Sequence, residues 1–293
     1  MNINIEKNDI YSTLTTYLYC NFHMMYTAER RGHTPYLHWP KGKSLQCYED
    51  HLMFLGLPNQ YDWFFKQPFT NENNPSQVWT WEHAGWGHNV VDDNLMSQPL
   101  SVIRDYYQKH LNFNDATNER GNAIVSKYNI DFSKTIGITW RGTDIYLDKR
   151  PRLPIEVYFP FIDDILKDNP DMRIMCTAEE QGILEPLLNR YPSAFTIDEF
   201  VSAPNGAKEN PEKLKSKIRG YERGLQPVLM VWLFSKCAHY IKNRSSTGAV
   251  ASWLSSGKIY CLAHEETLSY NLNMNDQVEI EGVKYPLNFS YEK

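Results

Sequence analysis

The sequence predicts an α/β protein whose C-terminal half forms a parallel, doubly wound sheet. Strand-like and helix-like segments alternate strictly between residues 131 and 262. The strand-like segments are short apolar runs, as in sheets that helices cover on both faces. Several of these runs stop in a polar cluster, which is typical of α/β sheets that hold a ligand beyond the carboxyl ends of their strands. The alternation implies βαβ units and therefore parallel strands.

The elements of this half follow from periodicity and from the residues at their ends. The predicted strands are Thr135–Trp140, Arg173–Cys176, Ala194–Ile197, Ala238–Ile241 and Lys258–Leu262. The predicted helices are Pro154–Leu166, Glu179–Tyr191, Leu225–Cys237 and Thr247–Ser256. Proline suits the first turn of the first of these helices, and the acidic start of the second suits the helix dipole. Pro227 is acceptable only in the first turn of its helix, and residues 198–223 form a polar loop.

The N-terminal half is less regular and predicts a second, smaller α/β domain. Its predicted helices are Tyr11–Arg31, Tyr48–Leu55 and Ser101–Leu111, and its predicted strands are Thr34–Trp39 and Val78–Glu82. Residues 66–76 read as a loop, and Asn112–Gly121 is the candidate linker. We therefore expect an N-terminal domain over residues 1–130 and a C-terminal domain over 131–262. The tail, residues 263–293, is expected to contain a hairpin around Glu281-Gly282 and to pack back on the first domain.

Composition excludes several classes of protein. The net charge of −5 gives no basic footprint for nucleic acid, because Glu209 and Glu212 interrupt the one cationic cluster, Lys208–Arg219. No apolar run is long enough for a membrane span, and the N-terminus lacks the pattern of a signal peptide. The five cysteines have no framework spacing, which favours a reducing compartment. We expect a soluble, intracellular protein of the cytoplasm.

The most informative stretch is the strand that ends in Arg141-Gly142-Thr143-Asp144. An arginine at the carboxyl end of a buried strand is a permanently charged fork that suits phosphate oxygens. Asp144 is placed to orient Arg141 or to cap the following turn. The alternative is a purely structural Arg–Asp pair at the strand end.

A second cluster, Ile241-Lys242-Asn243-Arg244-Ser245-Ser246-Thr247-Gly248, runs from the end of a predicted strand through a hydroxyl-rich turn into a predicted helix. The first N–H groups of a helix lack internal partners and carry partial positive charge, so they bind phosphate, and nearby hydroxyls add to this. The alternative is ordinary N-capping by Ser246 or Thr247. Because this turn and Arg141 belong to the same predicted sheet edge, we favour a shared anion site.

The third cluster is Thr177-Ala178-Glu179-Glu180, again at a strand end. Glu179 could accept hydrogen bonds from a base or a ribose, or could simply be an acidic residue in the first turn of a helix. Together the three clusters fit a nucleoside diphosphate. A dinucleotide and ATP fit less well, because neither the G-x-G-x-x-G fingerprint nor the phosphate-binding loop of ATPases is present.

The motifs resemble those of the fucosyltransferase superfamily, which includes core α1,6-, nodulation and protein O-fucosyltransferases. Gly137–Asp144 is similar to its first motif, which ends in Arg-x-Thr-Asp, and Pro154-Ile155-Glu156-Val157-Tyr158 is similar to the helix start that follows. Thr177–Glu180 resembles its acidic turn, and Leu229–Ser256 resembles its third motif. The similarity covers about 120 residues and keeps the order and spacing of the motifs.

This resemblance implies a GT-B fold with two Rossmann-like domains, in which the C-terminal domain holds the nucleotide-sugar donor and the N-terminal domain faces the glycan acceptor. It implies inverting glycosyl transfer without a metal or other cofactor. Arg141 would bind the β-phosphate and neutralise the leaving diphosphate, with Gly142, Thr143 and Asp144 beside it. Ser245, Ser246 and Thr247, preceded by Arg244, would hold phosphate oxygens. Glu179 would stand at the position where the family has an aspartate that contacts the base. Thr177 would lie beside it.

Departures from the family pattern leave the donor and the base open. Thr139 stands where the family often has histidine, and Gly142 stands where core fucosyltransferases have a second arginine. GDP-fucose is the expected donor, with UDP-xylose or another nucleotide-sugar as the alternative. An inverting transfer needs a base near the acceptor hydroxyl. Asp148 and Glu82 are the candidates, with Asp92-Asp93 as a further alternative.

Two other readings remain. One is a non-catalytic glycan- or nucleotide-binding module on the same fold. The other is an epimerase or dehydrogenase, which would need the dinucleotide fingerprint that the sequence lacks. His83 and His88 do not suggest a metal site, because their spacing misaligns them on a helix and no third ligand is evident.

Overall fold

The structure is a computed structural model that describes residues 2–6, 14–39, 59–69, 77–79, 95, 98–141, 153–180, 182–200, 220–243, 245–262, 276–280 and 283–291. The chain divides into two compact units. The first unit contains residues 1–122 and 215–230, and the second contains residues 123–214 and 231–293. The division falls close to the expected domain boundary at residue 130, with the addition that a later segment returns to the first unit.

The first unit contains a small parallel sheet of order β2-β1-β4. Its elements are β1 (Asn2–Glu6), α1 (Leu14–Arg30), β2 (Thr34–His38), the 3₁₀ helix η2 (Gln60–Trp63), β3 (Phe65–Lys66), β4 (Gln77–Trp79), α2 (Leu100–His110), β5 (Asn112–Phe113) and the first part of α3 (Asp115–Tyr128). The α1 helix buries Leu18, Phe22 and Met25 along one face, and the Phe22 ring stacks on Tyr107 of α2 at 4.5 Å. The strand β1 is not foreseen by the sequence analysis.

Side-chain amides complete the hydrogen bonding at the outer side of β2. The Gln67 amide accepts from the Leu37 N–H at 3.2 Å and donates to the Leu37 carbonyl at 2.9 Å. The Asn59 amide donates to the same carbonyl and accepts from the Trp39 N–H at 2.8 Å. Asp62 accepts from the Gln67 amide at 2.7 Å and so fixes its orientation. The N–H and carbonyl of Leu37 and the N–H of Trp39 thus have partners, as buried backbone groups require.

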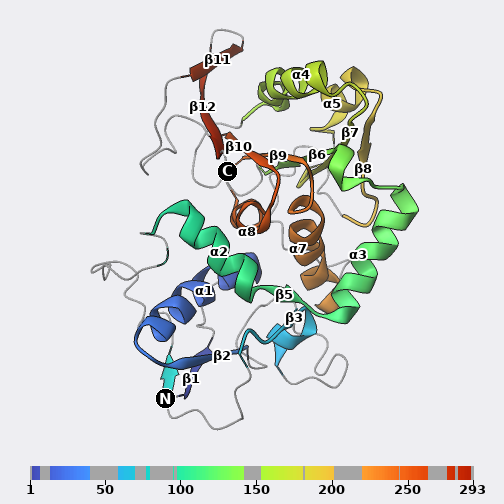
Figure 1. The fold of residues 1–293 in the computed structure, drawn as a ribbon. Helices are drawn as coiled ribbons and strands as arrows, with labels where there is room; N and C mark the ends of the chain where they lie inside the picture. Colours follow the sequence, from blue (N-terminus) through green and yellow to red (C-terminus); the bar gives the residue numbers. More distant parts are fainter. Residues whose placement is uncertain are drawn as a thin grey trace. The chain divides into compact units, whose positions relative to one another are not determined.

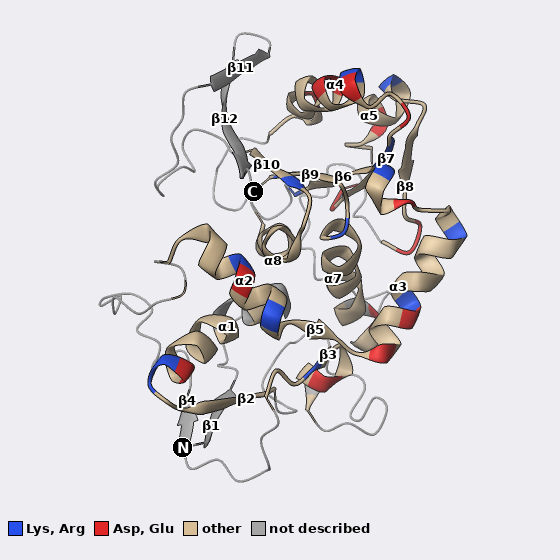
Figure 2. Ribbon diagram, in the orientation of Figure 1, with Lys and Arg blue, Asp and Glu red and all other residues tan. Residues whose placement is uncertain are grey.

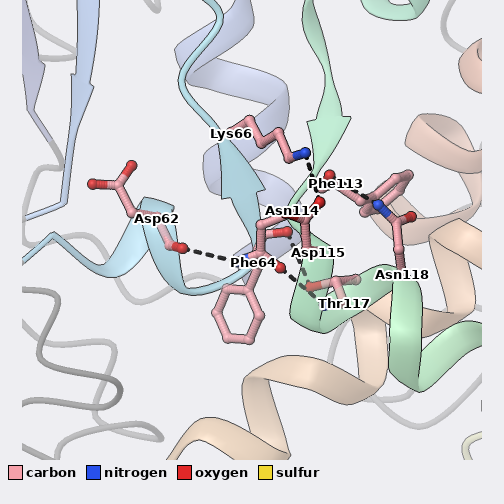
Figure 3. Close-up of polar contacts among 8 residues, drawn as sticks. All are labelled: Asp62, Phe64, Lys66, Phe113, Asn114, Asp115, Thr117 and Asn118. Atoms are coloured by element: carbon pink, nitrogen blue, oxygen red, sulfur yellow. Dashed lines mark hydrogen bonds and ion pairs between the residues drawn. The ribbon is translucent and has the colours of Figure 1, made fainter.

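The predicted linker begins instead with the short strand β5 and continues as the helix α3 (Figure 3). Asn114 precedes α3, and its side chain accepts from the Thr117 N–H at 2.9 Å, which is the contact of a helix N-cap. Thr117 and the Asn114 N–H both donate to the Phe64 carbonyl, so the start of α3 is tied to the β3 region. An ion pair between Lys66 and Asp115, 2.6 Å apart, lies beside it.

The second unit contains a seven-stranded sheet of order β11-β12-β10-β9-β6-β7-β8. Its elements are η5 (Phe132–Lys134), β6 (Thr135–Trp140), η7 (Ile155–Tyr158), α4 (Phe159–Asp168), β7 (Arg173–Ala178), α5 (Glu185–Arg190), β8 (Ala194–Thr196), the end of α7 (Gly220–Phe234), β9 (His239–Asn243), α8 (Ser246–Leu254), β10 (Lys258–Leu262), β11 (Asp276–Ile280) and β12 (Val283–Tyr291). The five strands from β10 to β8 are parallel, as predicted.

Helices cover both faces of this parallel sheet (Figure 1). On one face, η7, α4 and α5 bury a cluster that includes Ile138, Trp140 and Ile162. On the other face, the end of α7 lies so close to β6 that a Cβ on Gly137 would come within 2.7 Å of the Phe234 ring. All six residues of β6 are buried, which explains why its sequence contains no charged side chain.

Three predicted elements differ from the structure. The helix predicted from Glu179 begins at Glu185, after a turn in which Gly182 has a φ of +80°. The α7 helix begins at Gly220 rather than Leu225, so Pro227 lies inside the helix and not in its first turn. The tail forms the expected hairpin, β11 with β12, but β12 also pairs antiparallel with β10, so the second unit's sheet extends beyond residue 262, where the predicted sheet ends.

Candidate functional site

The carboxyl ends of three neighbouring parallel strands bring the predicted clusters together. In register, Thr139 of β6 lies beside Thr177 of β7 on one side and beside Lys242 of β9 on the other. Arg141 follows β6 directly, Glu179 follows β7, and Ser245 follows β9. The structure therefore places Arg141, Glu179 and the start of α8 at one edge of one sheet, as the sequence analysis expected.

The backbone of Arg141 is held by the side chain of Asn243. The Asn243 amide accepts from the Arg141 N–H at 2.9 Å and donates to the Arg141 carbonyl at 2.5 Å. Asn243 is buried, so these bonds form in surroundings where a lost partner is costly. The two bonds fix the point at which the arginine leaves the sheet. Asn243 belongs to the second predicted cluster, but its sequence signal, an amide at the end of a strand, did not predict this role.

The Arg141 side chain points toward the end of β7. Its Nε lies 3.2 Å from Oε1 of Glu179, and the side chains of the two residues are 20% and 37% exposed, respectively. The Glu179 N–H also donates to the Trp140 carbonyl at 3.3 Å, which ties the two strand ends together. Because Glu179 lies before helix α5, the reading of Glu179 as an acidic residue in the first helical turn is wrong. Its carboxylate instead directs the guanidinium.

A buried polar layer supports β6 just before Arg141. The Thr139 hydroxyl is hydrogen bonded to the Tyr240 hydroxyl at 2.8 Å, and Tyr158 donates to the Thr139 carbonyl at 3.2 Å. Burial raises the pKa of both tyrosines well above their ordinary value, so both remain protonated at neutral pH. Trp140 adds a bond from its ring N–H to the Leu153 carbonyl at 2.8 Å. The strand end that carries Arg141 is thus fixed from the adjacent strand and from η7.

Helix α8 begins with an N-cap made by Ser245, whose Oγ accepts from the Gly248 N–H at 2.8 Å. The prediction that Ser246 or Thr247 would be the capping residue is therefore wrong, and these two residues occupy the first helical turn. All three side chains are partly exposed. The first turn contains no acidic residue, and Figure 2 shows α8 without charged side chains, in contrast to α3 and α4. Its positive end has no carboxylate within the helix to offset it.

Other predicted site residues are placed differently or fall outside the description. Thr177 is only 6% exposed, so its side chain belongs to the interior of the sheet edge. The remaining predicted residues, Glu82, Gly142, Thr143, Asp144, Asp148 and Arg244, lie outside the described residues, as do His83, His88, Asp92 and Asp93. Within the described ranges, no group of three or more His, Cys, Asp or Glu residues is arranged to hold a metal ion.

Solved structures with the same fold are fucosyltransferases. A NodZ α-1,6-fucosyltransferase soaked with GDP-fucose matches with a TM-score of 0.51 and 14% identity, over 94% of this chain and 98% of that chain. NodZ co-crystallised with GDP matches with a TM-score of 0.50 and 11% identity, over 90% and 95% of the two chains. A mutant of Arabidopsis thaliana FUT1 in complex with GDP matches with a TM-score of 0.46 and 12% identity, over 88% of this chain and 70% of that chain.

The two NodZ matches confirm the expected GT-B fold, in which both domains are of the α/β type. No protein-family model matches the sequence, and no curated protein does. None of the helices in the described part of the chain is long and apolar enough to cross a membrane.

Proposed function

We propose that this protein is an inverting, metal-independent glycosyltransferase that moves L-fucose from GDP-fucose to a hydroxyl group of a glycan. The observation that carries the proposal is the position of Arg141. Asn243 fixes its backbone at the carboxyl end of β6, on the same sheet edge as the N-terminus of α8, whose first turn contains no acidic residue. A guanidinium and a helix N-terminus on one edge suit the two phosphates of a nucleoside diphosphate.

In the proposed reaction, the acceptor hydroxyl oxygen attacks the anomeric carbon while the bond from that carbon to the β-phosphate oxygen breaks. Negative charge develops on the leaving diphosphate. Arg141 and the first N–H groups of α8, with the hydroxyls of Ser245, Ser246 and Thr247, stabilise this charge from fixed positions, which is an effective form of catalysis. Such a pair of positive groups replaces the metal ion that other transferases use at this step.

Glu179 has two parts in the proposal. Its carboxylate directs the Arg141 guanidinium, which is 3.2 Å away. As an acceptor at the end of β7 it also offers hydrogen bonds to the base or ribose of the donor. The proton of the acceptor hydroxyl goes to a carboxylate, for which Asp148 and Glu82 remain the proposed candidates. Cys176, Cys237 and Cys261 are free thiols, and we propose that the enzyme acts in the cytoplasm.

The test is a donor panel on wild-type protein and an Arg141→Ala variant. Thermal shifts with GDP-, UDP-, CMP- and dTDP-sugars identify the nucleotide, and a ligand present at 100 times its Kd should stabilise the protein by about 2.7 kcal/mol. Transfer to glycan acceptors is then measured with the donor that binds. We expect GDP-fucose to be selected, and Arg141→Ala to lower kcat/KM by a factor that corresponds to at least ~3 kcal/mol, with the fold intact.

Arg190→Ala is the matched control, because this arginine is half-exposed on α5 and pairs with Asp163 on α4. It should leave transfer unchanged. Selection of a UDP-sugar would change the donor and keep the mechanism. Donor binding without transfer or donor hydrolysis would indicate a binding module. Near-normal kcat/KM in Arg141→Ala would remove the role proposed for this residue.

A further inference from the structure

Lys242, at the end of β9, is a buried cation that the preceding account does not use. It is only 6% exposed. Its Nζ donates to Sγ of Cys261, its register partner on β10, at 3.4 Å. Within the described residues it forms no ion pair with a carboxylate. A neutral thiol is a weak acceptor, so this contact does little to balance a buried positive charge.

Burial of an ammonium group without an anionic partner is unfavourable. Most lysines avoid this cost by extending their charged end into solvent. Lys258, on the next strand, is exposed in this way. The burial of Lys242 therefore calls for a partner with negative charge.

The position of Lys242 indicates where such a partner would bind. A Cβ built on Gly248 would lie 3.0 Å from Cδ of Lys242 and 2.8 Å from Oγ of Ser245. The lysine chain therefore passes against the first turn of α8, next to the residue that caps it. A lysine beside a helix N-terminus places two positive groups together, which is unfavourable for the protein alone. A lysine and a helix N-terminus that lie together are, however, a common arrangement in phosphate-binding sites.

We propose that Lys242 is a second cation, in addition to Arg141, that binds the diphosphate of the donor. In the order β10-β9-β6, Lys242 lies on β9, Arg141 directly follows the adjacent strand β6, and α8 starts just beyond β9. When the donor binds, Nζ exchanges its contact with Cys261 for one with a phosphate oxygen. This inference rests on the proposed function, and it adds a preference for a diphosphate over a monophosphate. The competing explanation is structural: the contact of Lys242 with Cys261 stabilises the sheet and has no part in ligand binding.

The experiment compares Lys242→Met with wild type, and uses Lys258→Met as the matched control. Ligand-free thermal unfolding is measured first, followed by the Kd values of GDP, GMP and guanosine. We expect the Tm of Lys242→Met to equal or exceed that of wild type, because an apolar chain of similar length removes an uncompensated buried charge. Its affinity for GDP should fall by about tenfold or more, its affinity for GMP less, and that for guanosine not at all. Lys258→Met should change none of these values.

Cys261→Ser separates the two explanations. If Lys242 acts on the donor, this variant keeps wild-type affinity for GDP. If Lys242 and Cys261 form a structural pair, both Lys242→Met and Cys261→Ser lower the Tm, Lys242→Met leaves the affinity for GDP unchanged, and the inference is overturned. Lys242→Gln, which keeps a polar chain, decides the question if Lys242→Met does not fold.

The failure of this inference can be told from the failure of the proposed function. If wild-type protein binds GDP and both Lys242 variants bind it equally well, only the role of Lys242 is lost. If wild-type protein binds no nucleoside diphosphate at all, the proposed function falls, and the role of Lys242 falls with it.

Discussion

The side-chain amide of Asn243 forms hydrogen bonds with both the N–H and the carbonyl of Arg141, at 2.9 and 2.5 Å, as the main chain of a paired strand would. The arginine therefore leaves the sheet from a fixed backbone, although β6 itself ends at Trp140. The position of the Arg141 guanidinium is better defined as a result, because its backbone is fixed and only the side-chain rotamers remain to be ordered. Pre-organisation of this kind lowers the cost of ordering a charged group around a ligand.

We expect Asn243→Ala to lower both stability and activity. The free energy of unfolding should fall by about 1–3 kcal/mol, because two main-chain groups of Arg141 lose their partner. Urea unfolding measures this loss, and GDP binding should weaken in the same variant. Asn59→Ala is the matched control, since Asn59 makes the same kind of amide contact beside β2 in the other unit. It should lose stability to a similar extent and keep its affinity for GDP. Equal GDP affinity in both variants would show that Asn243 does not position Arg141.

Gly248→Ala should disrupt the start of α8. The new Cβ would lie 2.8 Å from the capping Ser245 Oγ, so the cap must move. Crowding of this kind costs about 1–3 kcal/mol, which exceeds the roughly 1 kcal/mol that alanine gains over glycine in a helix. We expect a lower free energy of unfolding together with weaker GDP binding, measured by calorimetry. Gly32→Ala, where the backbone has a φ of +74° and open space around the Cβ, should destabilise the protein and leave GDP binding unchanged.

Two substitutions of Glu179 distinguish the effect of its negative charge from its role as the hydrogen-bond acceptor that orients the Arg141 guanidinium. The Glu179–Arg141 pair is partly exposed, so its loss should change stability by less than about 1 kcal/mol. Glu179→Gln keeps an oxygen that can accept from Nε of Arg141, and its kcat/KM should remain within a few-fold of wild type. Glu179→Ala removes that acceptor, and its kcat/KM should fall by about tenfold or more, as for the loss of one charge-assisted hydrogen bond. An unchanged kcat/KM in the alanine variant would rule out a directing role.

Acid should destabilise the protein partly through His239. Burial lowers the pKa of this histidine, and the nearby Lys258 acts in the same direction. A lowered pKa in the folded state means that the unfolded chain takes up the proton first, so this contribution to stability is complete above about pH 6.5 and is lost as the pH falls through the folded-state pKa. Urea unfolding at pH 7, 6 and 5 should show this decline. It should be less steep in His239→Gln, and an unchanged slope would contradict the assignment.

The sequence was sufficient for the parts of the fold that local pattern determines. The strand Thr135–Trp140 was predicted with its observed bounds, because an apolar run that ends in a charged residue has few other readings. The order of parallel strands and helices followed from the same alternation. The placement of Arg141 and of the α8 N-terminus at one sheet edge could then be predicted, since parallel strands end together.

Features that depend on tertiary contacts could not be predicted. The turn at Gly182 delays the start of α5, and nothing in the acidic sequence before it distinguishes a turn from a first helical turn. Ser245, Ser246 and Thr247 are all good N-cap residues, and only the position where β9 ends selects the first of them. The amide contact of Asn243 and the burial of Lys242 depend on strands that are far apart in sequence.

The amides of Asn59 and Gln67 that complete β2 have a consequence for how this protein behaves in a crowded solution. An open strand edge is a template on which a second chain can add a strand, and this is a common route to aggregation. Here two side chains occupy the positions that an incoming strand would need, without any strand being added. The outer side of β2 is thereby protected from such pairing by two amides, together with Pro35 of the same strand, which has no N–H group to offer to an incoming chain.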